Sequence, residues 1–284
     1  MSPEALFERA YQLASDIESR VLEIEQSSRL PDDVIEAFIS AGFPAILVPR
    51  SRGGFELDLD TVARIVRIFA AVCPSVAWNL CFYIGQNGII CQMPVALQDR
   101  YFGSGPNSLL AGSLVPFFEL TPVSGGFLAT GRASWCSGAP HADFLLLAGR
   151  TCGEQDKRRL AFGVERTSAK LMDTWSVEGM RATGSIDVAL DRQFIPHEHA
   201  MQLDDLFAGN GSGATLYPSN PMYRRPAEQM ALSYQLPVFV GACRGAADEL
   251  LAVSRRRVHT NSGVAAAAKP TTHAHVGHAR ARAV

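Results

Sequence analysis

The sequence predicts an α+β multidomain protein: a helical bundle, then a middle domain that is an antiparallel β-barrel or sandwich, then a second helical bundle that stops short. Apolar residues recur at helical spacing at first, the period shortens to two in the middle of the chain, and helical spacing returns near the end. The expected domains are residues 1–107, 108–215 and 216–284. With 47% hydrophobic and 19% charged residues, the chain can bury a sizeable core.

Four helices are expected in the first domain. One amphipathic helix is predicted from apolar residues three and four positions apart, namely Leu6, Ala10, Leu13, Ile17, Val21 and Ile24. A second begins at Pro31 and ends near Gly42. Asp58 suits the N-cap of a third, which ends before Pro74. The fourth, residues 75–91, is apolar almost all round, as a central helix would be.

The middle domain is predicted from short runs with a period of two, separated by Gly, Pro and Ser turns. The runs are residues 109–113, 126–135, 143–150, 160–164 and 181–190. This spacing is typical of a sandwich or small barrel. A connection at 209–219 leads to a further helical pattern from about Pro221, and Pro270 is expected to begin one more helix.

Composition excludes several classes of protein. Lys and Arg number 26 against 28 Asp and Glu, so the electrostatic basis for binding nucleic acid is missing. No apolar run approaches the roughly 20 residues that span a bilayer, and the first residues lack the pattern of a signal peptide. We therefore expect a cytoplasmic protein with no membrane partner. The six cysteines form no C-x-x-C pair, so no metal site is predicted, and most are expected to be buried, reduced thiols.

A series of phrases, in order, resembles the acyl-CoA dehydrogenase superfamily. They lie at residues 30–42, 48–54, 111–113, 131–138 (GRASWCSG), 141–143 (HAD), 175–188 (WSVEGMRATGSIDV) and 195–196. The Ser-Gly, His-Ala-Asp and Gly-Met-Arg-x-Thr-Gly-Ser combination is more similar to the flavin-dependent monooxygenase branch, the two-component (group D) aromatic hydroxylases, than to true acyl-CoA dehydrogenases. The resemblance covers nearly the whole chain.

This resemblance implies a reduced-flavin-dependent monooxygenase that hydroxylates an aromatic or heteroaromatic small molecule through a flavin C4a-hydroperoxide. The implied cofactor is reduced FMN or FAD, supplied by a separate NAD(P)H:flavin reductase, with molecular oxygen as co-substrate. Members of the family form homotetramers and complete a carboxy-terminal four-helix bundle, whereas about two of those helices are expected here. We therefore expect exposed apolar surface at residues 236–251.

By the same resemblance, the turn at residues 135–138 lies against the flavin ring. Ser137 is the expected hydrogen-bond partner of flavin N5, with Cys136 as the alternative in a different register. Trp135 would lean on the ring system, and Gly138 would let the backbone approach closely. The structural alternative is a β-turn with a buried Trp and an incidental Ser.

Three further cofactor contacts are implied. Ser113 would lie at the barrel rim beside the flavin pyrimidine edge, or else bond its own backbone at a strand end. Arg181 would contact a flavin phosphate, although an ion pair, for example with Asp187, is favoured. Arg257 is a second candidate for the phosphate, against the default of a solvated run of charges.

The expected catalytic residues are Ser137, Gln86, Asn87 and His141. Many relatives carry a His followed by Asn on the central helix, and Gln86 stands where that His would fall. Gln cannot accept a proton at neutral pH, but it can hydrogen-bond a substrate carbonyl or ring N–H, which disfavours phenol-type substrates. The titration range of His141 suits acid–base chemistry, but a structural hydrogen bond is favoured for it.

Two alternative functions stay open. An acyl-CoA dehydrogenase needs a catalytic Glu, and one subset of that family has it about where Ala231 falls here, with Glu228 a poor substitute nearby. The other alternative is a non-catalytic fragment of the same fold.

Overall fold

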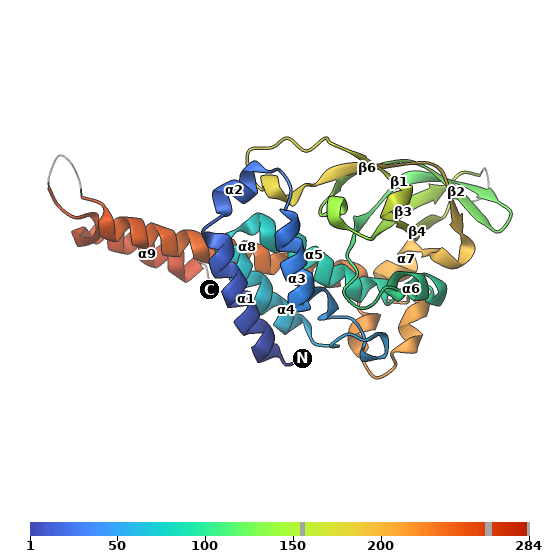
Figure 1. Ribbon diagram of the computed structural model, residues 1–284, viewed down its shortest axis with the longest axis horizontal. Coiled ribbons are helices and arrows are strands. Elements are labelled where there is room, and N and C mark those ends of the chain that lie inside the picture. Colours follow the sequence, from blue (N-terminus) through green and yellow to red (C-terminus); the bar gives the residue numbers. More distant parts are fainter. Residues whose placement is uncertain (154–156, 259–262, 283–284) are drawn as a thin grey trace.

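The computed structural model describes residues 1–153, 157–258 and 263–282. A group of helices forms one side of the body and a β-sheet the other, and a hairpin of two helices extends away from the body (Figure 1). The order of elements is the predicted one, with helices first, strands next and helices last.

The helices of the first part are α1 (Pro3–Glu18), α2 (Val21–Gln26), α3 (Asp32–Ala41), α4 (Leu59–Val72), α5 (Pro74–Ile90) and α6 (Val95–Phe102). The single helix predicted to run to Ile24 is wrong, because the chain breaks between α1 and α2. At the break, the Ser19 hydroxyl bonds the Asp16 carbonyl, and Arg20 pairs with Glu23 and Asp33. Such local side-chain bonds offer the backbone an alternative to the helix.

The expected ends of α3 and α4 are confirmed. Gly42 has φ +80° directly after α3, the left-handed conformation that glycine adopts without strain. The Asp58 carboxylate accepts the Thr61 backbone N–H at 2.8 Å and caps α4.

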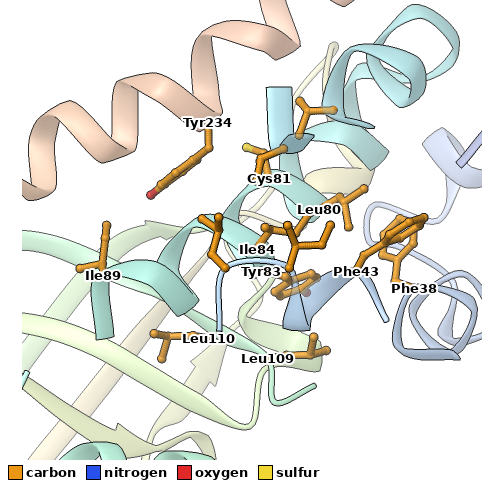
Figure 2. Packing of buried hydrophobic residues seen from close by; sticks show 14 of the residues in the cluster. Phe38, Phe43, Leu80, Cys81, Tyr83, Ile84, Ile89, Leu109, Leu110 and Tyr234 are labelled. Atoms are coloured by element: carbon orange, nitrogen blue, oxygen red, sulfur yellow. The ribbon is translucent and has the colours of Figure 1, made fainter. Parts of the chain in front are cut away.

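Helix α5 is the central helix of the core, as its apolar sequence predicts. Figure 2 shows Tyr234 reaching from α8 (Ala227–Arg256) toward Cys81 and Ile84 of α5. Gly85 makes this approach possible, since a Cβ there would lie 2.0 Å from Tyr234 Cδ1. Glycine at this position therefore sets how closely α8 packs on α5.

The sheet has seven strands in the order β5-β6-β2-β1-β3-β4-β7. Their bounds are β1 (Leu110–Val123), β2 (Gly126–Cys136), β3 (Phe144–Thr151), β4 (Arg159–Glu165), β5 (Lys170–Met172), β6 (Ile186–Pro196) and β7 (Ala200–Gln202). Pairing is antiparallel as predicted, except that β1 and β3 run parallel. Strand β1 is longer than predicted and shifts register on both sides of Pro116, which has no N–H to donate to the ladder.

The last part consists of α7 (Leu203–Ala208), α8 and α9 (Pro270–Arg282). Helix α8 packs on α4 through Gly241 and Gly245, where an added Cβ would lie 2.7 Å from the Arg67 carbonyl and 2.0 Å from the Ala71 carbonyl. Its outer half leaves the body and forms the hairpin with α9 (Figure 1). The expected exposed apolar surface is confirmed, because Leu236, Phe239 and Leu250 are all exposed.

Candidate functional site

A cavity of about 440 Å³ opens between α5, the sheet and α8. Its wall is formed by Phe82, Gln86, Ile89, Gly112, Ser113, Leu114, Val115, Pro116, Trp135, Leu146, Phe207, Ala227, Glu228, Ala231, Tyr234 and Gln235. Most of these side chains are apolar, and four carry aromatic rings of the kind that pack against a planar ligand. Three of the predicted residues, Gln86, Ser113 and Trp135, meet in this wall.

Gln86 carries an unsatisfied polar atom in the cavity wall. Its side chain is 7% exposed, and its Oε1 has no hydrogen-bond partner among the residues that the structure describes. A buried acceptor left in this state costs about 1–3 kcal/mol. The arrangement therefore favours a ligand that donates a hydrogen bond here.

Strand β1 reaches the cavity at a position with a backbone conformation that favours glycine. Gly112 has φ +145°, and a Cβ there would lie 2.0 Å from the Leu146 carbonyl oxygen of β3. Next to it, Ser113 Oγ accepts the Val115 N–H at 3.4 Å, a bond to its own backbone, but Ser113 lies inside β1 and not at a strand end as predicted. Ser113 is thus at the rim with its hydroxyl on its own backbone.

The four residues of the turn at 135–138 have different surroundings in the structure. Trp135 has φ +60° and a side chain that is 70% exposed at the cavity, so the alternative of a buried Trp is wrong. Cys136 is fully buried in the apolar core of the sheet, and this burial raises the pKa of its thiol to about 12. Cys136 therefore does not face the cavity.

Gly138 has φ +74°, and a Cβ there would lie 2.6 Å from the Tyr83 hydroxyl, which donates to the Gly138 carbonyl at 2.9 Å. The close backbone approach predicted at Gly138 thus occurs against Tyr83 of α5.

Ser137 is buried in a chain of hydroxyl groups. Trp78 Nε1 donates to Ser137 Oγ at 3.0 Å, Ser137 and Ser185 lie 2.8 Å apart, and so do Ser185 and Thr183. The Thr183 hydroxyl donates its one proton to the Met180 carbonyl at 2.9 Å, so it can only accept from Ser185. Ser185 therefore donates to Thr183, and for the same reason Ser137 donates to Ser185. Ser137 is 5% exposed and is not among the residues that form the cavity wall. Its role toward the flavin stays a prediction.

Asn87 lies one residue from Gln86 but points into the core. Its Nδ2 donates to the Pro44 and Ser108 carbonyls at 2.9 and 3.1 Å, and its Oδ1 accepts the Tyr101 hydroxyl at 2.5 Å. These bonds connect three segments of the chain and leave the Asn87 amide no free group for a ligand. Asn87 is also absent from the cavity wall.

The two predicted arginines also lie away from the cavity wall. The backbone N–H of Arg181 donates to Glu25 at 2.9 Å, and its carbonyl accepts Trp175 Nε1 at 3.0 Å. The ion pair suggested between Arg181 and Asp187 is wrong, because Asp187 pairs with Arg132 across β2 and β6. Arg257 follows the last residue of α8, at the outer end of the hairpin.

His141 hydrogen-bonds through Nε2 to Asp32 at 3.0 Å, which is the structural contact favoured for it. Burial lowers the pKa of His141, and the neighbouring Arg29 and Arg166 act in the same direction, against the opposing effect of Asp32. The folded protein therefore disfavours the imidazolium more than the unfolded chain does.

We accordingly expect stability to fall as the pH drops below the ordinary pKa of histidine, about 6.5, and to keep falling until the folded-state pKa is passed. Thermal unfolding between pH 7.5 and 5, compared for the wild type and His141→Gln, checks this. The variant should show the smaller loss on acidification. Equal losses in both proteins would show that His141 does not contribute.

The sequence predicted Trp135 but none of the other aromatic residues of the wall, which are Phe82, Phe207 and Tyr234. Trp78 and Phe82 precede Gln86 by eight and four residues, so the three lie on one face of α5. The Trp78 and Phe82 rings are 5.2 Å apart, and Tyr234 of α8 lies 5.7 Å from Phe82. Helical spacing could have found Trp78 and Phe82, but not Tyr234, which is distant in the sequence.

Within residues 1–153, 157–258 and 263–282, no group of three His, Cys, Asp or Glu side chains is placed to hold a metal ion. Among the described helices, none has the length and apolarity needed to cross a membrane.

Relatives identify the family. No protein-family model matches the chain. It is 35% identical over 279 residues to a pigment production hydroxylase from a Rhodococcus species, covering 98% of this chain and 72% of that protein. It is 24% identical to the oxygenase component of p-hydroxyphenylacetate 3-hydroxylase from Acinetobacter baumannii, spanning 63% of its length, and 26% identical to indole-3-acetate monooxygenase from Pseudomonas putida, spanning 65%.

Solved structures agree with this result. XiaF from a Streptomyces species, in complex with FADH2 and glycerol, superposes with a TM-score of 0.88 at 25% identity, covering 97% of this chain and 70% of that one. The HsaA monooxygenase from Mycobacterium tuberculosis superposes with a TM-score of 0.91 at 22% identity, over 100% of this chain and 73% of that one, and shows the fold. The chain belongs to the oxygenase components of the two-component flavin-dependent monooxygenases, which have the acyl-CoA dehydrogenase fold.

Proposed function

We propose that the protein hydroxylates an aromatic or heteroaromatic small molecule, using reduced FMN or FAD and molecular oxygen. A separate NAD(P)H:flavin reductase would supply the reduced flavin. As part of this proposal the protein acts as a homotetramer and works in the cytoplasm. The chain spans less than two thirds of several of its relatives, so activity, substrate and partners all belong to the proposal.

The observation that carries the proposal is the unpartnered Gln86 oxygen in a cavity with aromatic walls. A planar aromatic molecule would pack against the wall that Phe82 and Tyr234 help to form, and an N–H or O–H on its edge would satisfy Gln86. Because Gln86 cannot take up a proton, it binds and orients such a substrate without acting as a base. This supports a substrate with a ring N–H over a phenol that must lose its proton.

The wall opposite α5 has the features needed to hold a flavin. Strand β1 has no side chain at Gly112 to obstruct a ring, Ser113 lies beside it, and Trp135 presents an exposed indole. When bound there, the reduced flavin supplies the oxygen activation. The contribution of the apolar wall is to exclude water, which protects reactive species from side reactions.

The dehydrogenase alternative is not favoured. Ala231 lines the cavity at the place where that function needs a carboxylate, and Glu228 lies one turn earlier with an exposed side chain. The relatives are named as hydroxylases and monooxygenases.

The test supplies the protein with reduced FMN or FAD, isotopically labelled oxygen and either an indole or a phenol. Mass spectrometry should find one labelled oxygen atom in the product, with the indole-type substrate preferred. If no labelled oxygen enters the substrate and an acyl-CoA bleaches the oxidised flavin, the proposal is overturned in favour of the dehydrogenase.

Replacing Gln86 with leucine should raise the KM for a substrate with a ring N–H by about tenfold, the equivalent of about 1.4 kcal/mol for one lost hydrogen bond. Steady-state kinetics of substrate consumption measure this. Gln235→Leu, at a residue that also lines the cavity but has no unsatisfied buried atom, is the control and should change KM little. An unchanged KM in Gln86→Leu would remove Gln86 from the substrate site.

A further inference from the structure

Glu228 gives the cavity its charge. Among the residues that the structure describes, it is the only member of the cavity wall whose side chain is charged. It lies on α8 with Ala231 and Gln235, three and seven residues later, so one face of the helix borders the cavity. Its side chain is exposed, and its carboxylate has no hydrogen-bond or ion-pair partner in the described part of the chain. The carboxylate is therefore free to meet a ligand.

The cationic side chains nearest to the wall in the sequence lie outside it. Arg132 of β2 is paired with Asp187 of β6. Arg224 and Arg225 precede α8, but both are exposed to solvent and neither lines the cavity. The N-terminus of α8 contributes a partial positive charge of about half an elementary charge. The full charge of Glu228 on that first turn exceeds it, so this end of the cavity is negative.

We propose that Glu228 selects the substrate by charge and favours a heteroaromatic amine over the corresponding carboxylic acid. This inference rests on the proposed function, because it names the class of substrate that the same cavity takes. The ring packs against the aromatic wall with its N–H on Gln86 Oε1, which is buried and has no partner among the described residues. An ammonium group on a side chain of the ring extends toward the exposed carboxylate of Glu228.

A carboxylic acid on the same ring binds less well for two reasons. Its carboxylate meets the like charge of Glu228, and the described part of the wall offers no cationic side chain in place of the water that the acid gives up. An uncharged ring meets neither the attraction nor the repulsion. Because Glu228 is exposed, solvent screens its charge, and each effect changes the Kd by a few-fold.

The test compares tryptamine, indole and indole-3-acetate, which share one ring and differ in charge. Equilibrium dialysis without oxygen, in the presence of reduced FMN or FAD, measures the Kd of each. Tryptamine should bind about tenfold more tightly than indole-3-acetate, with indole between them, and high salt should reduce this ratio. Equal Kd values, tighter binding of the acid, or no detectable binding of tryptamine would overturn the inference.

Glu228→Gln keeps the size of the side chain and removes its charge, so the preference for tryptamine over indole-3-acetate should disappear. The matched control is Glu4→Gln. Glu4 is likewise exposed and is also the second residue of its helix, α1, but it lies outside the cavity wall. This variant should keep the ratio of the wild type. An unchanged ratio in Glu228→Gln, or an equal loss in both variants, would show that Glu228 does not select the charge.

Charge selection and hydroxylation can fail separately, because binding without oxygen requires no turnover. A preference for tryptamine in a protein that transfers no labelled oxygen would support charge selection and contradict the hydroxylase. A labelled product together with equal binding of the three ligands would support the hydroxylase and overturn charge selection by Glu228.

Discussion

Gly85→Ala should lower the free energy of unfolding by about 2–3 kcal/mol, as overpacking of a core does. The added Cβ would lie 2.0 Å from Tyr234 Cδ1 and 2.3 Å from its Cε1. Tyr234 is 2% exposed, and its ring lies 5.7 Å from that of Phe82 in an edge-on contact, so it has little room to move. Figure 2 shows it between α8 and α5. Alanine gains about 1 kcal/mol over glycine in a helix, but the clash outweighs that gain.

Chemical denaturation of the variant measures this loss. Gly277→Ala is the matched control: Gly277 also lies inside a helix, but nothing is within 4 Å of an added Cβ, so stability should rise. Combining Gly85→Ala with Tyr234→Val should recover part of the loss, because it removes the ring. A Gly85→Ala protein as stable as the wild type would show that α8 does not pack on α5 in this way.

Asn87→Leu should lower the free energy of unfolding by about 3 kcal/mol, since it removes a fully buried amide from its partners. The Pro44 carbonyl loses the Asn87 N–H, and the Tyr101 hydroxyl keeps only the Ser108 carbonyl. The polar groups left behind cannot reach water. None of these partners belongs to the cavity wall, so the substitution should lower stability and leave the site intact.

Gln86→Leu, at the neighbouring residue, should have the opposite pair of effects on stability and substrate binding. It removes an unpartnered buried oxygen, so it should weaken substrate binding while leaving stability equal to the wild type or slightly higher. Asn87→Leu should lose stability while the folded fraction keeps its kcat/KM. Denaturation curves and kinetics below the unfolding temperature separate the two. A selective loss of kcat in folded Asn87→Leu would return Asn87 to the catalytic residues.

Local signals predicted much of the fold. Three of these signals act within a few residues, and each is confirmed: Asp58 caps α4, Gly42 ends α3, and the apolar residues all round α5 make it a buried helix. The break at Ser19 and Arg20 was not predicted, because apolar spacing does not report the local Ser19 bond to Asp16 or the pairing of Arg20 with Asp33 of another helix. The parallel pairing of β1 with β3 likewise depends on how distant strands meet, which the period of a strand does not specify.

The candidate site divides in the same way. The sequence by itself determined the family and the order of helical and β parts, and it predicted Gln86 as a site residue. Only the tertiary structure decided that Gln86 meets Ser113 and Trp135 around one cavity, while Asn87, one residue away, turns into the core. The physical reason is that successive residues of a helix point about 100° apart, so their surroundings come from distant segments that no local pattern encodes.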